Sequence, residues 1–298
     1  MAPRFSIVIP ALNSEQVLAR ALDSIAAQEI AYGVEIIVAD GGSTDNTIRI
    51  ASAYADTRVL PGPDAGIYHG VNKALAAATG TIIGWLNSDD LLYPGTLKSV
   101  GEAFARDSTL DFVSGGVTIG PTADPRHWLE QEEPLSPKGI LFGIPAINAR
   151  FFRKDFLLGL GPLDPSAGLG ADRELLLRAA KRKVRSAALP RPVYHYSVHA
   201  GSTTIAGDKG ARERLLKAEI VLNDYVRRHY GSEPDVLNSV ATAETLSALR
   251  LHAARLRGLD PSPALVARTS SVSPLRLVVS APWALHDWWT WRRRLSGY

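Results

Sequence analysis

The chain has 298 residues, of which 46% are hydrophobic and 21% are charged, and its formal net charge is +3. This length allows one large α/β domain with an appended segment, and the composition excludes a disordered chain. The absence of cysteine excludes disulfides, thiolate metal ligands and cysteine nucleophiles, and the small net charge gives no indication of nucleic acid binding.

Apolar runs and amphipathic stripes alternate through the first half of the chain. The expected elements, in chain order, are strands at residues 5–10, 34–38, 57–60 and 81–86, and helices after a Ser14 cap, from Thr44, at 67–78 and at 95–106. In the first helix Val17, Leu18, Ala21, Leu22 and Ile25 form one apolar stripe. This alternation predicts an α/β fold with a mostly parallel, doubly wound sheet flanked by helices.

The second half is less regular. Residues 111–117 form one more expected strand, and residues 121–137 are rich in loop-forming residues. Helical periodicity returns at 171–183, 211–230 and 240–257. We therefore expect an α-helical C-terminal extension.

Acidic side chains follow two of the expected strands. Asp40 ends the strand at 34–38, and Asn87, Ser88, Asp89 and Asp90 follow the strand at 81–86. The carboxyl ends of neighbouring parallel strands meet in one crevice, where open α/β sheets bind ligands. Adjacent aspartates repel each other unless a hard cation or a nucleotide hydroxyl meets them. The two segments therefore predict a metal-assisted nucleotide site.

Several ordered motifs resemble those of the family 2 glycosyltransferases. These are residues 6–10, 39–45 and 64–68, the pair Asn72-Lys73, and residues 86–90, within a resemblance that covers roughly residues 5–201. The resemblance implies a GT-A fold and inverting transfer of a sugar, of the hexosyltransferase type. The donor would be a nucleotide-diphospho-sugar, and the acceptor a hydroxyl of a glycan or lipid-linked molecule. The branch it is most similar to builds bacterial surface polysaccharides and lipid-linked oligosaccharides.

The resemblance also implies roles for individual residues. Asp40 and Asp64 would hold the nucleotide, while Asn72 and Lys73 would face the diphosphate or the sugar. Three of these residues have an alternative role: Asp40 as a turn or helix-cap residue, Asp64 as an N-cap and Lys73 as a solvated helix residue. We expect Asp45 to be structural. The full expected donor-binding set comprises Pro10, Asp40, Asp64, Gly66, Asn72, Lys73, Asn87, Ser88 and Asp90.

The metal and the general base complete the expected site. By resemblance, Asp89 binds Mg²⁺ or Mn²⁺ that bridges the diphosphate, and Asp90 is a second ligand or orients the donor. Inversion needs a carboxylate that deprotonates the attacking hydroxyl, and the resemblance implies Asp172. An N-cap role is the alternative for Asp172, and Asp164 and Glu174 are the other candidate bases.

Two features beyond residue 195 each have two possible roles. His199 lies in a segment that resembles the loop closing over the donor, where it contacts the diphosphate or metal, or else is an ordinary surface residue. Tryptophans at 283, 288, 289 and 291 precede Arg292, Arg293 and Arg294. This composition is typical of an interfacial membrane anchor, and packing on the protein's own core or on a second subunit is the alternative.

The expected organisation is a GT-A domain at residues 1–205 and a helical extension at 206–298. The nucleotide-binding half is about 1–110 and the acceptor half about 111–205. The start has no signal-peptide pattern and no apolar run spans a bilayer, so we expect a cytoplasmic protein, peripheral on the inner face of the membrane if the tail is an anchor. The rival functions are a non-catalytic nucleotide-sugar-binding protein and a nucleotidyltransferase. The residues after Pro10 lack the Gly-rich, basic loop expected of the latter.

Overall fold

The computed structural model describes residues 4–29, 33–121, 127–129, 131, 135–143, 145–199, 209–241 and 243–245. Contacts divide the chain into two compact units. The first comprises Met1–Pro134, Ala146–Pro165 and Arg178–Ser197, and the second comprises Leu135–Pro145, Ser166–Leu177 and Val198–Tyr298. The expected boundary near residue 205 stays a prediction, because these units are assembled from non-contiguous segments.

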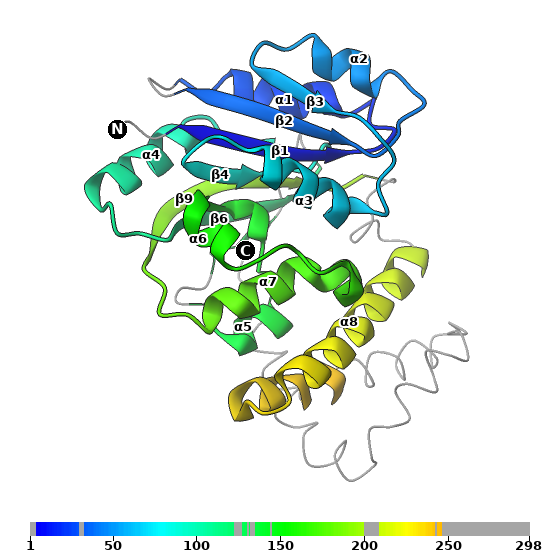
Figure 1. Ribbon diagram of the computed structural model, residues 1–298, viewed down its shortest axis with the longest axis vertical. Helices are drawn as coiled ribbons and strands as arrows, with labels where there is room; N and C mark the ends of the chain where they lie inside the picture. The colour runs from blue at the N-terminus through cyan, green and yellow to red at the C-terminus, as the bar shows by residue number, and fades with distance from the viewer. Residues whose placement is uncertain are drawn as a thin grey trace. The chain divides into compact units, whose positions relative to one another are not determined.

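Within the described residues of the first unit, nine strands form one mixed sheet in the order β3-β2-β1-β4-β8-β6-β9-β5, with β7 beside β6 (Figure 1). The parallel half consists of β1 (Phe5–Ala11), β2 (Val34–Asp40), β3 (Thr57–Leu60) and β4 (Ile82–Trp85). The rest consists of β5 (Leu91–Leu92), β6 (Phe112–Gly120), β7 (His127–Leu129), β8 (Arg150–Arg153) and β9 (Ser186–Ser197). The expected fold class is confirmed.

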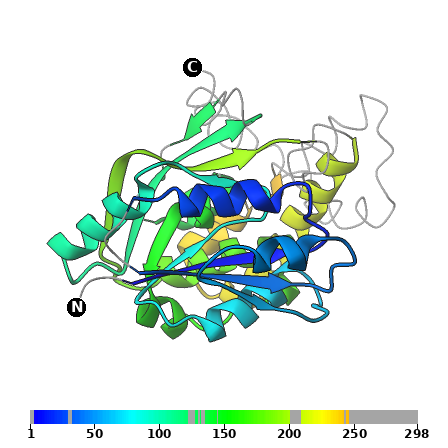
Figure 2. The ribbon, with the colours of Figure 1, turned by 90° about the horizontal axis from the view of Figure 1, so that it is seen from above.

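Helices cover both faces of the parallel half. α1 (Leu18–Ala26) and α2 (Thr47–Ser52) lie on one face, and α3 (Ile67–Ala77) packs on β1 and β2 from the other (Figure 2). α4 (Thr96–Arg106) follows β5. One expectation was wrong: α1 begins at Leu18 without a side-chain cap. The Ser14 hydroxyl instead donates to the carbonyl of Leu12 at 3.3 Å.

The long strand β9 was not expected from the sequence. Its two prolines, Pro190 and Pro192, lie where its parallel pairing with β6 shifts register, and Pro192 is opposite Gly116. Prolines lack the N–H that a ladder needs, so they are tolerated at such irregularities. Gly115 has no room for a Cβ because the Val193 side chain occupies that space. The close approach of β9 to β6 therefore depends on a glycine.

Short helices and their caps complete the connections. η1 (Ile147–Ala149) leads into β8, and α6 (Lys154–Gly159) follows β8. Two arginines close the end of α6: Arg178 Nη1 donates to the carbonyl of Leu160, and Arg182 Nη2 to that of Gly159, each at 2.5 Å. Cations at a helix C-terminus satisfy carbonyls that have no partner within the helix.

The amino edge of the sheet is tied together by Glu35, at the start of β2. Its Oε1 accepts hydrogen bonds from the Ser6 hydroxyl, from Thr79 N at 2.5 Å and Oγ1 at 2.8 Å, and from Gly80 N at 3.0 Å. Gly80 N also donates to Ser6 Oγ at 2.7 Å. One carboxylate thus joins β1, β2 and the turn before β4.

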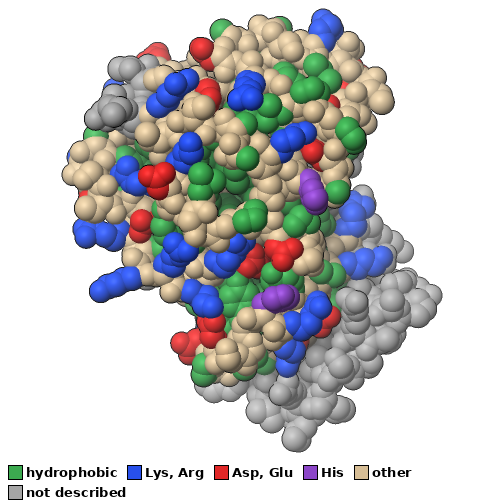
Figure 3. All heavy atoms as spheres, in the orientation of Figure 1, with side chains coloured by type: hydrophobic (Ala, Val, Ile, Leu, Met, Phe, Trp, Pro, Cys, Tyr) green, Lys and Arg blue, Asp and Glu red, His purple; other side chains and the backbone are tan. Residues whose placement is uncertain are grey.

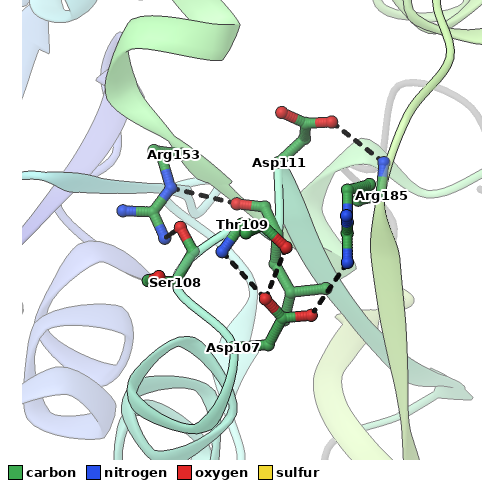
Figure 4. Close-up of polar contacts among 7 residues, drawn as sticks. Asp107, Ser108, Thr109, Asp111, Arg153 and Arg185 are labelled. Atoms are coloured by element: carbon green, nitrogen blue, oxygen red, sulfur yellow. Dashed lines mark hydrogen bonds and ion pairs between the residues drawn. The ribbon is translucent and has the colours of Figure 1, made fainter.

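A second polar cluster closes the same edge where β6 and β9 begin (Figure 4). Arg153 donates to the carbonyls of Leu110 at 3.0 Å and Ser108 at 2.9 Å. The backbone N–H of Arg185 donates to Asp111 Oδ2 at 2.9 Å, and the Arg185 guanidinium lies 3.8 Å from Asp107 Oδ2. Both clusters join loops to strand ends, so we interpret this edge as structural.

The described residues of the second unit are mostly helical. It contains α5 (Pro137–Phe142), most of η2 (Pro165–Gly170), the first part of α7 (Ala171–Ala180), α8 (Lys209–Tyr230) and further helical residues at 234–241 and 243–245. Its buried apolar side chains include Leu175, Leu176, Leu222, Val226, Val236 and Val240. Arg227 on α8 forms an ion pair with Glu244.

Two observations concern surface charge and membrane-spanning segments. In Figure 3, the Lys and Arg side chains of the described residues are interspersed with Asp and Glu. None of the helices in the described part of the chain has the length and apolar character needed to cross a membrane. The tryptophan- and arginine-rich tail lies outside the described residues.

Candidate active site

The carboxyl ends of β1, β2 and β4 lie at one edge of the sheet, within the first unit. In the parallel register Ala11 is opposite Asp40, and Val8 is opposite Trp85. The segments after these strands are therefore neighbours, as expected for a crevice at the end of a parallel sheet. The Ser14 and Ser88 hydroxyls, from the segments after β1 and β4, lie 3.0 Å apart.

Asp40 is fully buried at the end of β2. Its Oδ2 accepts hydrogen bonds from the backbone N–H groups of Gly42 and Ser43, both at 3.0 Å. Its Oδ1 is buried and has no hydrogen-bond partner in the part of the chain that the structure describes. Leaving such an acceptor unsatisfied costs about 1–3 kcal/mol, more when it is charged. One oxygen therefore shapes the turn, and the other retains unused capacity to accept a hydrogen bond.

Asp64 lies beside Asp40 and is held by Lys73 from α3. Lys73 Nζ is 3.1 Å from Asp64 Oδ1 and 3.5 Å from the carbonyl oxygens of Asp40 and Gly62. The Lys73 ammonium group therefore contacts protein groups at this edge of the sheet rather than extending into solvent. The N-cap of α3 is Gly66, with φ of +122° and no side-chain cap, so Asp64 does not cap this helix.

Asn72 makes a structural contact. Its Nδ2 donates to the carbonyl of Leu163 at 2.8 Å, and its Oδ1 accepts from the backbone N–H of Leu163 at 2.9 Å. Both polar atoms of its side chain are thus engaged with a segment 91 residues further on. The expected contact of Asn72 with the donor stays a prediction. Pro10 lies in the buried strand β1, opposite Ala39.

The segment after β4 divides its polar side chains between structure and binding. Asp90 is almost completely buried and accepts hydrogen bonds from the Tyr194 hydroxyl, from Ser197 N at 2.8 Å and from Asn87 Nδ2 at 3.0 Å. Asn87 Oδ1 accepts from Trp85 Nε1 at 3.1 Å. Asp90 and Asn87 thus connect this segment to the end of β9, while Asp89 is half-buried.

The environment of Asp90 differs from that of an exposed aspartate. Burial raises the pKa of Asp90 to about 7, with a further contribution from the charge of Asp89, against the opposing effect of the hydrogen bonds from Tyr194, Ser197 and Asn87. A carboxyl group with three donors already in place has little capacity left for a metal ion. Asp89 is therefore the better candidate ligand of the two.

Asp45 is structural, as expected. Its Oδ1 accepts from Thr47 N at 2.9 Å and from Thr47 Oγ1 at 2.5 Å, and its Oδ2 accepts from Glu15 N at 3.1 Å. The backbone N–H of Ser14 in turn donates to Thr47 Oγ1 at 2.7 Å. These contacts join the segment after β1 to the start of α2.

Sequence reasoning did not find the buried polar chain on β6 and β9. His195 Nδ1 lies 2.8 Å from Thr118 Oγ1, which lies 2.8 Å from the Tyr93 hydroxyl. Burial lowers the pKa of His195, and the positive charge of Arg20 lowers it further. The three residues are 25 and 77 positions apart, so no local motif could have connected them. His199, two residues beyond β9, is half-buried.

The expected bases lie in different units. Asp172, in the first turn of α7, is half-buried and its Oδ1 accepts from Arg173 N at 2.8 Å. Glu174 is almost completely buried and accepts a hydrogen bond from the Tyr230 hydroxyl at 2.6 Å. Both belong to the second unit, whereas Asp164 belongs to the first. Glu174 therefore has a structural contact where Asp172 is partly accessible.

The residues present are compatible with a hard divalent cation. Among the described residues, no group of three or more His, Cys, Asp or Glu side chains could enclose a metal. Mg²⁺ commonly binds through one or two carboxylates together with substrate phosphates and water. A partly accessible Asp89 at the carboxyl edge of the sheet fits that mode of binding.

Comparison with known proteins agrees with this geometry. Residues 6–169 match the model of the glycosyl transferase family 2. A "PGL/p-HBAD biosynthesis glycosyltransferase" of Mycobacterium tuberculosis is 39% identical over 127 residues, which cover 41% of this chain and 49% of that protein. The chain thus spans about half the length of this relative.

Two solved structures share the fold. S. aureus TarS 1–349 in complex with UDP-GlcNAc superposes with a TM-score of 0.58 at 20% identity, covering 85% of this chain and 87% of that chain. The mannosyltransferase PcManGT from Pyrobaculum calidifontis, in complex with GDP-Man and Mn²⁺, gives a TM-score of 0.59 at 20% identity, covering 98% and 87%. Since the family match extends over more than half of the sequence, the chain belongs to glycosyl transferase family 2.

Proposed function

We propose that this protein is an inverting glycosyltransferase that uses a nucleotide-diphospho-sugar donor, a divalent cation and an aspartate base. The observation that carries the proposal is the buried Oδ1 of Asp40 at the carboxyl edge of the sheet, which has no hydrogen-bond partner among the described residues. A base N–H or a ribose hydroxyl would satisfy this oxygen. Nucleotides bind at this edge in open α/β sheets.

The other residues of the crevice have complementary roles in this proposal. Asp64 provides a second acceptor for the nucleoside, oriented by its 3.1 Å contact with Lys73. Asp89 holds Mg²⁺ or Mn²⁺, which when bound neutralises the charge that develops on the leaving diphosphate. Asp90 and Asn87 hold the segment that carries Asp89 against the end of β9.

We assign the general base to Asp172 on the strength of the family resemblance. Its carboxylate takes the proton of the acceptor hydroxyl as that oxygen attacks the anomeric carbon. The bond from the anomeric carbon to the phosphate oxygen breaks, and the nucleoside diphosphate leaves with inversion. Asp172→Asn should abolish transfer while leaving donor affinity nearly unchanged. Turnover at the wild-type rate in this variant would exclude Asp172 as the base.

The substrate class follows from the relatives and is part of the proposal. TarS was solved with UDP-GlcNAc and PcManGT with GDP-Man, so a nucleotide-diphospho-sugar is the common donor class. For the acceptor we propose a glycan or a lipid-linked molecule in polysaccharide or glycolipid synthesis. An acceptor in the membrane would be consistent with a cytoplasmic enzyme held at the inner face of the membrane by its tryptophan-rich tail.

A thermal-shift screen tests the donor and the metal together. UDP-, GDP-, dTDP- and CDP-sugars are compared with and without Mn²⁺, on the wild type and on Asp89→Ala. A donor at 100 times its Kd stabilises the folded state by about 2.7 kcal/mol. We expect one nucleotide class to raise Tm only with Mn²⁺ and only when Asp89 is present. Asp111→Asn, at the opposite edge, is the matched control and should keep the full shift.

Product assays, read together with this screen, separate the rival functions. A donor-induced shift with no release of nucleoside diphosphate, across a panel of sugar acceptors, would indicate a non-catalytic binding protein. Release of inorganic pyrophosphate from a nucleoside triphosphate would indicate a nucleotidyltransferase. Transfer with inversion at the anomeric carbon, followed by NMR, is the result that the proposal requires.

A further inference from the structure

Helix α8 packs directly against the backbone that precedes Asp172. Gly168 has φ of +64°, and a Cβ there would lie 3.0 Å from Val221 Cγ1 on α8. A Cβ on Gly170 would lie 2.9 Å from Leu222 Cβ. Contacts this close leave no room for a side chain at Gly170 and favour glycine at Gly168. The turn that leads into α7 is thus shaped by α8.

A hydrogen bond also joins the first turn of α7 to the end of α8. The Tyr230 hydroxyl, at the end of α8, donates to Glu174 Oε1 at 2.6 Å, and the two residues are 56 positions apart. Both side chains are buried, with exposed fractions of 6% and 2%. A buried hydrogen bond to a charged group contributes more to stability than one between neutral groups. This contact fixes how the first turn of α7 is rotated.

The rotation of that turn determines where Asp172 points. Residues two apart on an α-helix project in directions about 200° apart. Glu174 is directed into the interior toward Tyr230, so Asp172 projects from the other side of the helix, where it is half-buried. A change in the contact of Glu174 therefore changes the direction of the Asp172 carboxylate.

We propose that Tyr230 is a positioning residue for Asp172, acting through Glu174. The inference rests on the proposed function, in which Asp172 is the general base. General-base catalysis requires the carboxylate to lie within hydrogen-bond reach of the acceptor hydroxyl. Helix α8 thus belongs to the catalytic apparatus rather than to an accessory extension.

The experiment compares Tyr230→Phe with Glu244→Gln in the full chain. Tyr230→Phe removes one hydroxyl and keeps the ring. Glu244→Gln weakens the Arg227–Glu244 ion pair in the same unit and has no contact with α7 among the interactions described for Glu244. Both variants should lose some global stability. Only Tyr230→Phe should raise the hydrogen–deuterium exchange of the amides at 171–177, about tenfold.

Turnover is then measured with UDP-GlcNAc and GDP-mannose in the presence of Mn²⁺ and a panel of sugar acceptors. We expect Tyr230→Phe to lower kcat about tenfold at unchanged donor KM, because misplacement of a reacting group affects the chemical step. Glu244→Gln should keep the wild-type kcat. Loss of stability alone would affect both variants alike.

Each contrary result identifies what failed. Unchanged exchange at 171–177, or unchanged kcat, in Tyr230→Phe overturns the role of Tyr230 when Asp172→Asn is inactive. Wild-type turnover in Asp172→Asn overturns the proposed base and this inference with it. Absence of turnover in the wild type contradicts the proposed function itself and likewise removes the basis of the inference.

Discussion

Strand β2 carries a carboxylate at each end, and the two have opposite environments. Glu35, at the amino end, accepts four hydrogen bonds on one oxygen, from Ser6, Thr79 and Gly80. Asp40, at the carboxyl end, uses one oxygen for the turn, and its other oxygen is buried with no hydrogen-bond partner in the described part of the chain. A satisfied carboxylate stabilises the fold, whereas an incompletely satisfied one lowers its stability, and this is the group that we propose contacts the donor.

The contrast extends along both edges of the sheet. At the amino edge, Asp107 and Asp111 are engaged with Arg185 and neighbouring backbone groups (Figure 4). At the carboxyl edge, where β2 ends at Asp40, Asp89 follows β4 and is partly accessible. Substitutions at the amino edge should therefore lower stability and leave donor binding intact. Substitutions at the carboxyl edge should weaken donor binding and leave stability nearly unchanged.

The largest effect on stability is expected from Gly80→Ala. A Cβ at this position would lie 2.6 Å from Ser6 Oγ and 2.7 Å from the backbone oxygen of Arg4. Because backbone atoms cannot move aside cheaply, the free energy of unfolding should fall by about 2–3 kcal/mol. Urea denaturation measures this loss. Gly33→Ala, whose Cβ meets only the Arg4 side chain at 3.7 Å, is the control and should be nearly neutral.

Asp40→Asn should have the largest effect on donor binding. The amide oxygen can still accept from Gly42 and Ser43, so the turn is retained, but the NH₂ group then replaces the free acceptor. We expect the Kd of the donor to rise about 10- to 100-fold, as for the loss of a hydrogen bond to a charged group. Titration calorimetry measures it, with Glu35→Gln as the control. An equal loss in both variants would refute the division between the edges.

Gly70→Ala sharpens the comparison, because the same type of substitution acts here on the site. A Cβ on Gly70 would lie 2.8 Å from Asp64 Oδ2, so the carboxylate must move relative to Lys73. Alanine is favoured over glycine in a helix by about 1 kcal/mol, which offsets the crowding. We expect donor affinity to fall about 3- to 10-fold with little change in Tm. Unchanged affinity would mean that Asp64 does not contact the donor.

The smallest effect concerns the pH dependence of stability through Glu35. Burial raises the pKa of Glu35, but the hydrogen bonds from Ser6, Thr79 and Gly80 outweigh it and leave the pKa below its ordinary value of 4.5. A lowered pKa in the folded state contributes stability above pH 4.5 that is lost as the pH falls through the folded-state pKa. Stability measured by denaturation at several pH values should therefore decrease less steeply below pH 4.5 in Glu35→Gln than in the wild type. Parallel curves would contradict this role.

Local patterns were sufficient to predict the parallel half of the sheet. The strands expected at 34–38 and 57–60 are observed as β2 and β3, and the acidic segments lie at strand ends as expected. Asp40 and Asp89 could be selected because strand and acidic residue are adjacent in the sequence. Periodicity and turn chemistry act over a few residues, which is the range of these features.

Long-range contacts could not be predicted in this way. Glu35 lies inside an expected strand, and its partners Ser6 and Thr79 are 29 and 44 positions away. β9 was missed because its two prolines argue against a strand unless the irregular pairing of β9 with β6 is known. The prediction that Ser14 caps α1 was wrong for the same reason. Its hydroxyl contacts that of Ser88, which follows another strand, rather than the start of α1.

The packing of α8 on Gly168 and Gly170 has a consequence for recombining this protein with its relatives. A chimera joined near residue 205 would exchange α8 while keeping the glycine-rich turn and Glu174, which are fitted to Val221, Leu222 and Tyr230. The segment at 166–177 and α8 therefore form one exchangeable module, although Arg178–Ser197 of the first unit separates them in the chain. Chimeras should keep their stability only when both pieces are exchanged together.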